Sequence, residues 1–285
     1  MQGRIVKIVS NQYTVQNEQG NRLVCICMGK VRLEGKPVVG DLVEYEIYDG
    51  QGSIEKILPR HNTMVRPAIA NVDQAIIVMS AADPAFSTTL VDFLTFLVCH
   101  AHIEPLLCIT KMDLIEEGSL DPIIEAYRKI GMKVFLCRKN ELNEDFAEQL
   151  KGRITVLTGQ SGVGKSSLLN RLNPDFRLQT QETSKALGRG KHTTRHSELH
   201  EVAGGLVADT PGFSKLDFSR MSIDELKESV REFRNIPECR FRDCIHVNEP
   251  DCEIKKAVDE GKIPSFRYEH YVEIVKEIQN RKVKY

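Results

Sequence analysis

The stretch that decides the fold is Gly159-Gln160-Ser161-Gly162-Val163-Gly164-Lys165-Ser166, near the middle of a chain of 285 residues. It matches the pattern G-x-x-x-x-G-K-[ST], whose glycines let backbone N–H groups turn toward phosphate oxygens without side-chain clash. We expect Lys165 to reach the β- and γ-phosphates of a nucleotide and the Ser166 hydroxyl to ligate Mg²⁺. The phosphate-binding residues that the pattern predicts are Gly159, Gln160, Ser161, Gly162, Val163, Gly164, Lys165, Ser166 and Ser167.

The residues on either side support a phosphate-binding loop. Residues 154–157 are a short, β-branched run, and the leucines of residues 167–172 have helical spacing. The loop is therefore expected between a strand and a helix N-terminus, where the helix dipole favours anions. The alternative is an accidental glycine-rich turn, which does not account for the strand and the helix.

A second nucleotide motif precedes this loop in the chain. Residues 105–109 predict a buried strand that ends in Thr110-Lys111-Met112-Asp113, a sequence similar to the guanine motif [NT]-K-x-D. The Asp113 carboxylate can accept hydrogen bonds from N1–H and the 2-amino group of guanine, donors that adenine lacks. The alternative is a turn in which the aspartate caps a helix. Since ligands of open α/β sheets bind at the carboxyl ends of strands, we expect Thr110, Lys111 and Asp113 to bind the base.

Further elements complete an α/β pattern around this motif. Residues 74–79 predict a buried strand, Ser87 or Thr88 can cap the next helix, and a helix at 122–129 precedes a strand at 133–136. The loop after that last strand is Cys137-Arg138-Lys139-Asn140, where many GTPases have Ser-Ala-Lys. The residue that contacts the base from this side stays unassigned.

Two stretches beyond the phosphate loop have the residues of nucleotide switches. Residues 187–194 are glycine-broken and basic, and either Thr193 or Thr194 can reach Mg²⁺ and the γ-phosphate; we take Thr194 with Ser166 as the expected magnesium ligands. Residues 205–208 predict a strand, followed by the D-x-x-G pattern from Asp209 to Gly212. There Asp209 would hold Mg²⁺ through water and the Gly212 N–H would bind the γ-phosphate. The alternative for Asp209 is a turn residue after a strand.

Near the end of the chain, three cysteines and a histidine are spaced C-x₄-C-x-H-x₅-C: Cys239, Cys244, His246 and Cys252. Three thiolates and an imidazole are a complete tetrahedral shell, which predicts one structural Zn²⁺. Scattered reduced cysteines, the alternative, would not cluster with a histidine in one short loop.

Helices flank this cluster in the sequence. Ser222 to Glu225 form a capping box for a helix to about Phe233, and residues 265–282 predict a last helix. A basic patch for RNA is expected from Arg240, Arg242, Lys255, Lys256, Arg267, Lys276, Arg281, Lys282 and Lys284.

The N-terminal residues predict a small β-barrel. Short strands are expected at 4–9, 13–15, 22–27, 41–47 and 53–58. Five strands in under seventy residues favour an OB-fold, a barrel that often binds oligonucleotides. Scattered cations such as Lys36 and Arg60 could serve RNA binding, or they could be ordinary solvated charges.

Composition limits the class of protein. The formal net charge of -1 gives no overall field toward nucleic acid, and no apolar run approaches the ~20 residues that span a bilayer. The N-terminus shows no signal-peptide pattern, so we expect a cytoplasmic chain without disulfides. The cysteines outside the zinc pattern are expected to pack as small hydrophobic side chains; they are Cys25, Cys27, Cys99, Cys108 and Cys137.

The order of the motifs is unusual, because T-K-M-D precedes the phosphate loop, and a circular permutation produces this order without changing the packed sheet. With Gly-Lys-His-Thr-Thr (190–194), Asp-Thr-Pro-Gly-Phe (209–213) and the cysteine pattern, the chain resembles the circularly permuted ribosome-biogenesis GTPases, in particular the family of ribosome small subunit-dependent GTPase A. The resemblance covers essentially the whole chain. It implies an OB-fold at 1–68, a GTPase domain at 69–218 and an α-helical zinc domain at 219–285.

The same resemblance implies GTP and GDP as ligands, with Mg²⁺, and the small (30S) ribosomal subunit and its rRNA as partners late in subunit maturation. We expect a monomer that does not enter membranes. Phe213 stands where Ras-like enzymes carry a water-positioning glutamine, so intrinsic hydrolysis should be slow and stimulated by the subunit, and His192 is our candidate replacement. A surface or RNA-contacting role for His192 is an equal alternative. Two rival functions are a P-loop ATPase and an RNA-binding scaffold whose GTP is structural.

Overall fold

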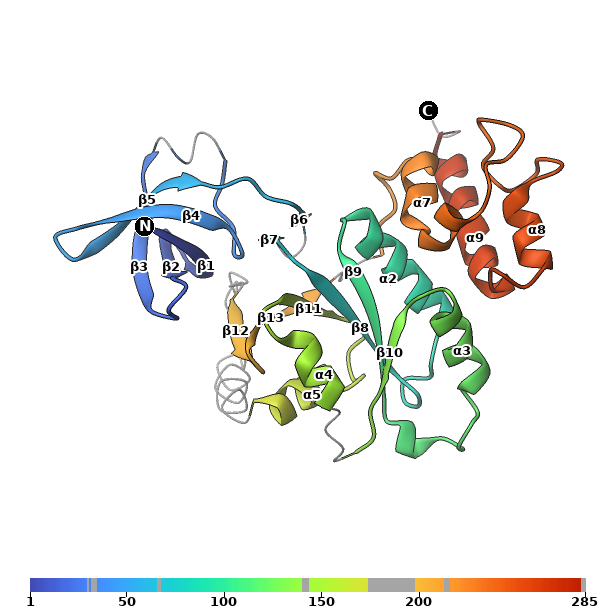
Figure 1. Ribbon diagram of the computed structural model, residues 1–285, viewed down its shortest axis with the longest axis horizontal. Helices are drawn as coiled ribbons and strands as arrows, with labels where there is room; N and C mark the ends of the chain where they lie inside the picture. Colours follow the sequence, from blue (N-terminus) through green and yellow to red (C-terminus); the bar gives the residue numbers. More distant parts are fainter. Residues whose placement is uncertain are drawn as a thin grey trace. The chain divides into compact units, whose positions relative to one another are not determined.

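The computed structural model describes residues 1–29, 31, 35–65, 68–139, 144–173, 198–212 and 216–282 (Figure 1). For residues 65, 144, 209–212 and 282 it describes the backbone only. In these parts of the chain, no helix combines the length and the apolar character needed to cross a membrane.

The first five strands close into a barrel in the order β1-β2-β3-β5-β4. They are β1 (Gln2–Val9), β2 (Gln12–Gln16), β3 (Arg22–Cys27), β4 (Leu42–Tyr48) and β5 (Gln51–Ile57). Neighbouring strands are antiparallel except β3 and β5, which are parallel. Alternate residues point inward, so that Ile5, Val15, Val43 and Ile54 are fully buried in one core. The predicted five-stranded OB-type barrel is confirmed.

The α/β part contains a sheet of six strands in the order β10-β9-β8-β11-β13-β12. The strands are β8 (Gln74–Ser80), β9 (Glu104–Thr110), β10 (Lys133–Leu136), β11 (Ile154–Thr158), β12 (Leu199–Val202) and β13 (Gly205–Gly212). The expected strands at 74–79, 105–109, 133–136 and 154–157 are confirmed. Strand β12 was not expected, and β13 extends through Gly212, four residues beyond the expected end. It continues because Gly212 still pairs with Thr158 of the parallel strand β11.

Four helices belong to the same part: α2 (Thr88–His100), α3 (Asp121–Lys129), α4 (Glu144–Leu150) and α5 (Lys165–Leu172). Ser87, rather than Thr88, caps α2, because its Oγ accepts from Leu90 N at 3.2 Å. Helix α4 had no counterpart in the sequence prediction. A short hairpin of β6 (Thr63–Val65) and β7 (Ala68–Ala70) follows the barrel.

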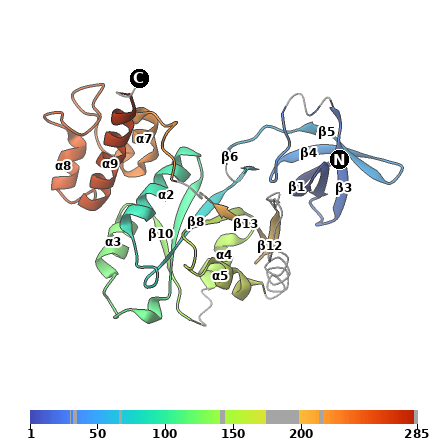
Figure 2. The ribbon, with the colours of Figure 1, turned by 180° about the vertical axis from the view of Figure 1, so that it is seen from behind.

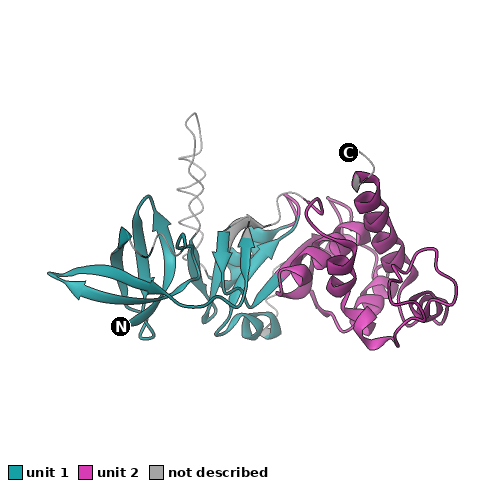
Figure 3. Ribbon diagram, turned by 90° about the horizontal axis from the view of Figure 1, so that it is seen from above, with its two compact units in different colours: residues 1–75, 142–159, 164–212 teal, residues 76–141, 160–163, 213–285 magenta. Residues whose placement is uncertain are grey.

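The chain divides into two compact units, coloured teal and magenta in Figure 3. The first unit comprises residues 1–75, 142–159 and 164–212 and includes the barrel, β11, β12, β13 and α5. The second comprises residues 76–141, 160–163 and 213–285 and includes β9, β10, α2, α3 and the C-terminal helices. The three domains at 1–68, 69–218 and 219–285 therefore stay a prediction.

The C-terminal part consists of α7 (Ile223–Ser229), the 3₁₀ helix η2 (Arg231–Asn235), α8 (Glu253–Asp259) and α9 (Ser265–Lys282), shown in orange and red in Figure 2. The capping box at Ser222 and Glu225 is confirmed, with both reciprocal hydrogen bonds present. A single helix to Phe233 is wrong. The chain is extended at Val230, which is buried in the same core as Leu226 and Tyr271 of α9.

Arg267 was expected in a surface basic patch, and the structure corrects this. Its side chain is buried, its Nη1 donates to Asp92 of α2 at 2.6 Å, and its Nε donates to Glu232. Although burial lowers it, the pKa of Arg267 is raised overall by Glu232 and Asp92, so the guanidinium stays charged. A buried cation requires such partners, and these carboxylates leave it unavailable to RNA.

Candidate nucleotide site and metal centre

The phosphate loop lies between β11 and α5, as the sequence predicted. Every residue of β11 is buried, which fixes the start of the loop in the sheet. Gly159, Gly162 and Gly164 have φ values of 138°, 82° and 94°, a region that side chains disfavour, so glycine is required for this turn. Lys165 begins α5, and its Nζ donates to the Gly159 carbonyl at 2.8 Å across the loop. Ser166 and Ser167 follow in the exposed first turn of the helix.

The D-x-x-G stretch ends beside this loop. Thr158, the last residue of β11, pairs with Gly212, so the backbone of residue 212 runs alongside the strand end from which the phosphate loop begins. The side chain of Asp209 is not among those described. His192, Thr193, Thr194 and Phe213 also lie outside the described residues. Their predicted roles therefore stay predictions.

The guanine motif follows the carboxyl end of β9. Lys111 adopts the left-handed conformation (φ 58°), and its Nζ donates to the backbone carbonyl of Asp83. Asp113 is exposed in a short 3₁₀ helix, η1 (Met112–Leu114). Its Oδ1 accepts from the backbone N–H of Lys139 at 2.9 Å. The carboxylate is thus held in place while remaining accessible to a ligand.

Lys139 and Asp83 are contacts that the sequence reasoning missed. Lys139 belongs to the loop after β10, which pairs with β9 so that Leu136 lies opposite Ile109. This parallel register brings the loop that follows β10 to the guanine motif. The sequence offered one signal for this contact, because the loop directly follows the predicted strand at 133–136. The residues of the loop differ from Ser-Ala-Lys and gave no second signal.

Thr110 connects the guanine motif to the phosphate loop within the second unit. The residue is buried, and its Oγ1 donates to the carbonyl of Val163 at 2.6 Å. Val163 is itself fully buried. The hydroxyl therefore holds the loop backbone.

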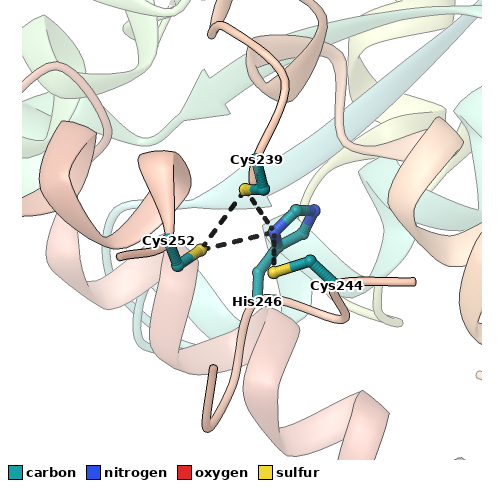
Figure 4. A group of neighbouring side chains, drawn as sticks. All are labelled: Cys239, Cys244, His246 and Cys252. Carbon is teal, nitrogen blue, oxygen red and sulfur yellow. Dashed lines mark hydrogen bonds between the residues drawn. The ribbon is translucent and has the colours of Figure 1, made fainter. Parts of the chain in front are cut away.

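The cysteine and histidine pattern converges in space, as Figure 4 shows. The Sγ atoms of Cys239, Cys244 and Cys252 lie 3.5, 3.3 and 3.4 Å from His246 Nδ1, and the Sγ atoms of Cys239 and Cys252 are 3.8 Å apart. A tetrahedral Zn²⁺ with ordinary bond lengths requires S···N separations of about 3.6 Å and S···S separations of about 3.8 Å. The four side chains therefore fit zinc, with Nδ1 as the histidine ligand atom.

The protonation states of these ligands suit a metal as well. Burial lowers the pKa of His246 to about 4, so the imidazole is neutral at pH 7 and has a lone pair to donate. Burial raises the pKa of the Cys244 thiol to about 12. This thiol stays protonated without a metal, so metal binding should release protons.

The loop that carries Cys244 and His246 is held by Glu249 and by two tyrosines. The Glu249 carboxylate accepts from the backbone N–H groups of Ile245 and Val247, each at 2.9 Å. Tyr268 and Tyr271 of α9 donate their hydroxyls to the carbonyls of His246 and Ile245, at 2.7 and 2.8 Å. Burial raises the pKa of Glu249, but the hydrogen bonds that its carboxylate accepts from backbone N–H groups lower it by more. The pKa is therefore below its ordinary value, and the carboxylate is ionised at neutral pH.

Glu249→Gln should therefore weaken zinc binding by about 10-fold or more, because groups that orient metal ligands typically contribute 10–100-fold to affinity. The amide would place an N–H₂ group against backbone N–H donors. Competition with a chromogenic chelator measures the zinc affinity. Glu260→Gln is the matched control, since Glu260 is exposed and pairs only with Lys262 among the contacts described here. Equal zinc affinity in E249Q and the parent protein would show that Glu249 does not order the loop.

Comparison with known proteins places the chain in a family. The RsgA GTPase family profile matches residues 57–219, and the RsgA N-terminal domain profile matches residues 2–54. The chain is 48% identical over 293 residues to the Small ribosomal subunit biogenesis GTPase RsgA of Geobacillus kaustophilus, covering 100% of this chain and 99% of that protein. It is 44% identical over 296 residues to the protein of the same name from Bacillus subtilis, with the same coverage.

Two solved structures have the same fold over nearly the whole chain. YloQ, described as a circularly permuted GTPase, superposes with a TM-score of 0.86 at 40% identity, covering 100% of this chain and 96% of that chain. YjeQ from Thermotoga maritima superposes with a TM-score of 0.86 at 38% identity, covering 98% of each chain. The description of YloQ as circularly permuted agrees with the motif order of this chain, and the two family profiles match its barrel and its α/β part. The chain belongs to the RsgA family of circularly permuted GTPases, which act in small ribosomal subunit biogenesis.

Proposed function

We propose that this GTPase acts late in the maturation of the small (30S) ribosomal subunit, binds the subunit and its rRNA, and is stimulated by it. The observation that carries the proposal is the full-length identity of 48% to a protein named for small-subunit biogenesis. The barrel and the zinc cluster at the two ends of the chain support it, since both kinds of module serve RNA binding in other proteins. We propose a monomer that works in the cytoplasm, where its partner is assembled.

The phosphate loop and the switches are the proposed catalytic machinery. Lys165 would leave the Gly159 carbonyl for the β- and γ-phosphate oxygens, where its charge stabilises a largely dissociative transition state. Ser166 and Thr194, with Thr193 as the alternative, are the proposed protein ligands of Mg²⁺, and Asp209 would hold the ion through water. The Gly212 N–H would donate to the γ-phosphate. Mg²⁺ neutralises charge on the phosphates when bound.

Base recognition is assigned to Asp113, with Lys111 along the base plane. The hydrogen bond from Lys139 N to Asp113 Oδ1 supports this assignment, because it fixes the carboxylate before the nucleotide arrives. Thr110 contributes by holding the Val163 carbonyl of the phosphate loop.

His192 is the proposed residue that positions the attacking water, because the phenyl ring of Phe213 has no group that orients water. We expect His192→Ala to lower subunit-stimulated turnover by about 10²-fold, the usual contribution of a positioned polar group, with GTP affinity unchanged. Stopped-flow phosphate release and nucleotide titration measure the two quantities. Unchanged stimulated turnover in H192A would remove this role and leave a surface or RNA contact.

The zinc cluster is proposed to be structural. Four protein ligands fill a tetrahedral shell, so no position is open for substrate. The ion would hold the loop between η2 and α8, which has little regular secondary structure of its own.

The test of the proposed function is phosphate release from GTP and from ATP, each with and without purified small ribosomal subunits. We expect slow GTP hydrolysis alone, strong stimulation by subunits and little ATP hydrolysis. Equal use of ATP would favour a P-loop ATPase with Asp113 as a helix cap. Tight subunit binding without turnover would favour an RNA-binding scaffold. If subunits did not change the rate of GTP hydrolysis, the GTPase activity would stand, but the small ribosomal subunit would no longer be the proposed stimulating partner.

A further inference from the structure

The loop between the first two zinc ligands presents an aromatic side chain to solvent. It contains Arg240, Phe241, Arg242 and Asp243, all four exposed, and Phe241 is 40% exposed. Among the phenylalanine and tyrosine side chains that the structure describes, Phe241 and Tyr48 have this degree of exposure. The hydroxyl of Tyr48 contacts Glu46 of its own strand, whereas a phenyl ring has no polar group that would favour exposure.

This loop is anchored at both ends. Cys239 and Cys244 belong to the metal cluster, and the Cys244 N–H donates to the Phe241 carbonyl at 3.2 Å to close a turn. The ring is therefore presented on a short turn whose two ends are proposed zinc ligands. Burying a phenylalanine side chain stabilises a protein relative to leaving it exposed. A fixed turn that keeps 40% of this side chain in contact with water is better explained by a partner than by folding.

The charges around the ring identify the kind of partner. The guanidinium carbon of Arg240 lies 5.7 Å from the Phe241 ring centroid, within cation–π range. Arg240 and Asp251 are 3.9 Å apart with both side chains mostly exposed, so their attraction is weak and leaves Arg240 available. Arg242, which follows Phe241 in the sequence, is exposed as well. The negative charges of Glu238 and Asp243 offset the positive charges of the two arginines. Attraction to phosphates alone is therefore too weak to hold RNA at this loop, and we expect stacking on the Phe241 ring to contribute.

The described residues on the outward sides of β2 and β3 in the barrel include no aromatic ring. On the outward sides of β2 and β3, Gln12 lies opposite Ile26 and Thr14 lies opposite Val24. None of these four side chains can stack on a base. Recognition of an unpaired base is therefore better suited to the zinc-anchored loop than to this part of the barrel.

We propose that Phe241 stacks on an unpaired base of ribosomal RNA while Arg240 and Arg242 contact the adjacent phosphates. Single-stranded RNA is recognised in this way, by bases stacked on aromatic or arginine side chains, and each stacked base contributes about 1–3 kcal/mol. This inference rests on the proposed function and specifies where the chain holds RNA.

The test compares the parent protein with Phe241→Ala, Phe241→Tyr and Leu216→Ala in the zinc-loaded full chain. Leu216 is a matched control, because it is an apolar side chain with the same 40% exposure as Phe241 and lies outside the barrel and the loop of the zinc ligands. One measurement is affinity for small ribosomal subunits with a non-hydrolysable GTP analogue. The other is the fluorescence of a ten-nucleotide poly(A) RNA with one 2-aminopurine, which stacking quenches. Zinc content and thermal melting confirm that each variant folds.

F241A should lose the quenching and bind subunits about 5–150-fold more weakly, which is the fold-change that corresponds to 1–3 kcal/mol. F241Y should retain both properties within about threefold, since a phenol stacks as a phenyl does, and L216A should match the parent protein. Equal subunit binding by F241A and the parent protein would overturn the stacking role while leaving the proposed function intact. If F241A bound subunits more weakly but the parent protein did not quench the RNA fluorescence, Phe241 would contact a ribosomal protein, and the RNA contact would be overturned. No subunit binding or stimulation in the parent protein would overturn the proposed function itself.

Discussion

Asp113→Asn should lower affinity for GTP by on the order of 10³-fold and confer binding of xanthosine triphosphate, because a site built to hydrogen bond one base strongly rejects a mismatched one. The carboxylate can accept from both N1–H and the 2-amino group of guanine, whereas the asparagine NH₂ would face the guanine amino group donor to donor. Xanthine has a carbonyl at position 2, which that NH₂ can donate to. Asparagine still has an oxygen to accept from Lys139 N, the 2.9 Å contact of the parent protein, so the loop should keep its conformation.

Titrations with fluorescent guanine and xanthine nucleotides measure this change, and phosphate release from both triphosphates shows whether turnover follows. Asp121→Asn is the matched control, since Asp121 is an exposed carboxylate in the first turn of α3. If D113N bound GTP as the parent protein does, Asp113 would be a turn residue and the rival ATPase function would gain support.

Cys252→Ser should remove most of the bound zinc and destabilise the C-terminal helices. Zinc binding contributes roughly 10–16 kcal/mol to the folding of small zinc domains, and a hydroxyl is a far poorer ligand than a thiolate. Cys252 also lies at the N-terminus of α8 and packs with Ile254, Ala257 and Ile263. We therefore expect a lower melting temperature and proteolysis within residues 236–264.

Zinc stoichiometry and thermal melting measure the effect of C252S, and excess chelator should reproduce it in the parent protein. Cys99→Ser is the control, because Cys99 is a buried cysteine of α2 outside the cluster. It should cost some stability but retain full zinc. Retention of one zinc by C252S with an unchanged melting temperature would show that the cluster does not need its fourth ligand.

Patterns that are local in the sequence predicted their structures well. The predicted zinc ligands lie within fourteen residues, from Cys239 to Cys252, and their side chains converge in space. The five cysteines outside that pattern are all buried, as expected of small apolar side chains. The buried strands of the sheet were also recognisable, because a continuous apolar run of β11 or β9 is long enough to stand out.

Elements that depend on distant partners were missed or wrong. Strand β12 has the sequence Leu-His-Glu-Val, too short and mixed to show a period, and it forms because β13 supplies its backbone partners. The helix expected to reach Phe233 breaks at Val230, where burial against α9 outweighs helical continuation. Arg267 resembled a surface cation because its partners Glu232 and Asp92 are 35 and 175 residues away.

By itself, the sequence determined where the candidate motifs lie: the phosphate loop, the predicted guanine motif, their permuted order and the pattern of three cysteines and a histidine. Each of these requires particular residue types at fixed spacing within a few residues, and such patterns are visible along a chain. Only the tertiary structure decided which backbone groups hold those residues, such as Lys139 N at Asp113 and the Val163 carbonyl at Thr110. These contacts depend on the register of paired strands and on the packing of loops. Because a backbone group of almost any residue can make them, no local sequence pattern predicts them.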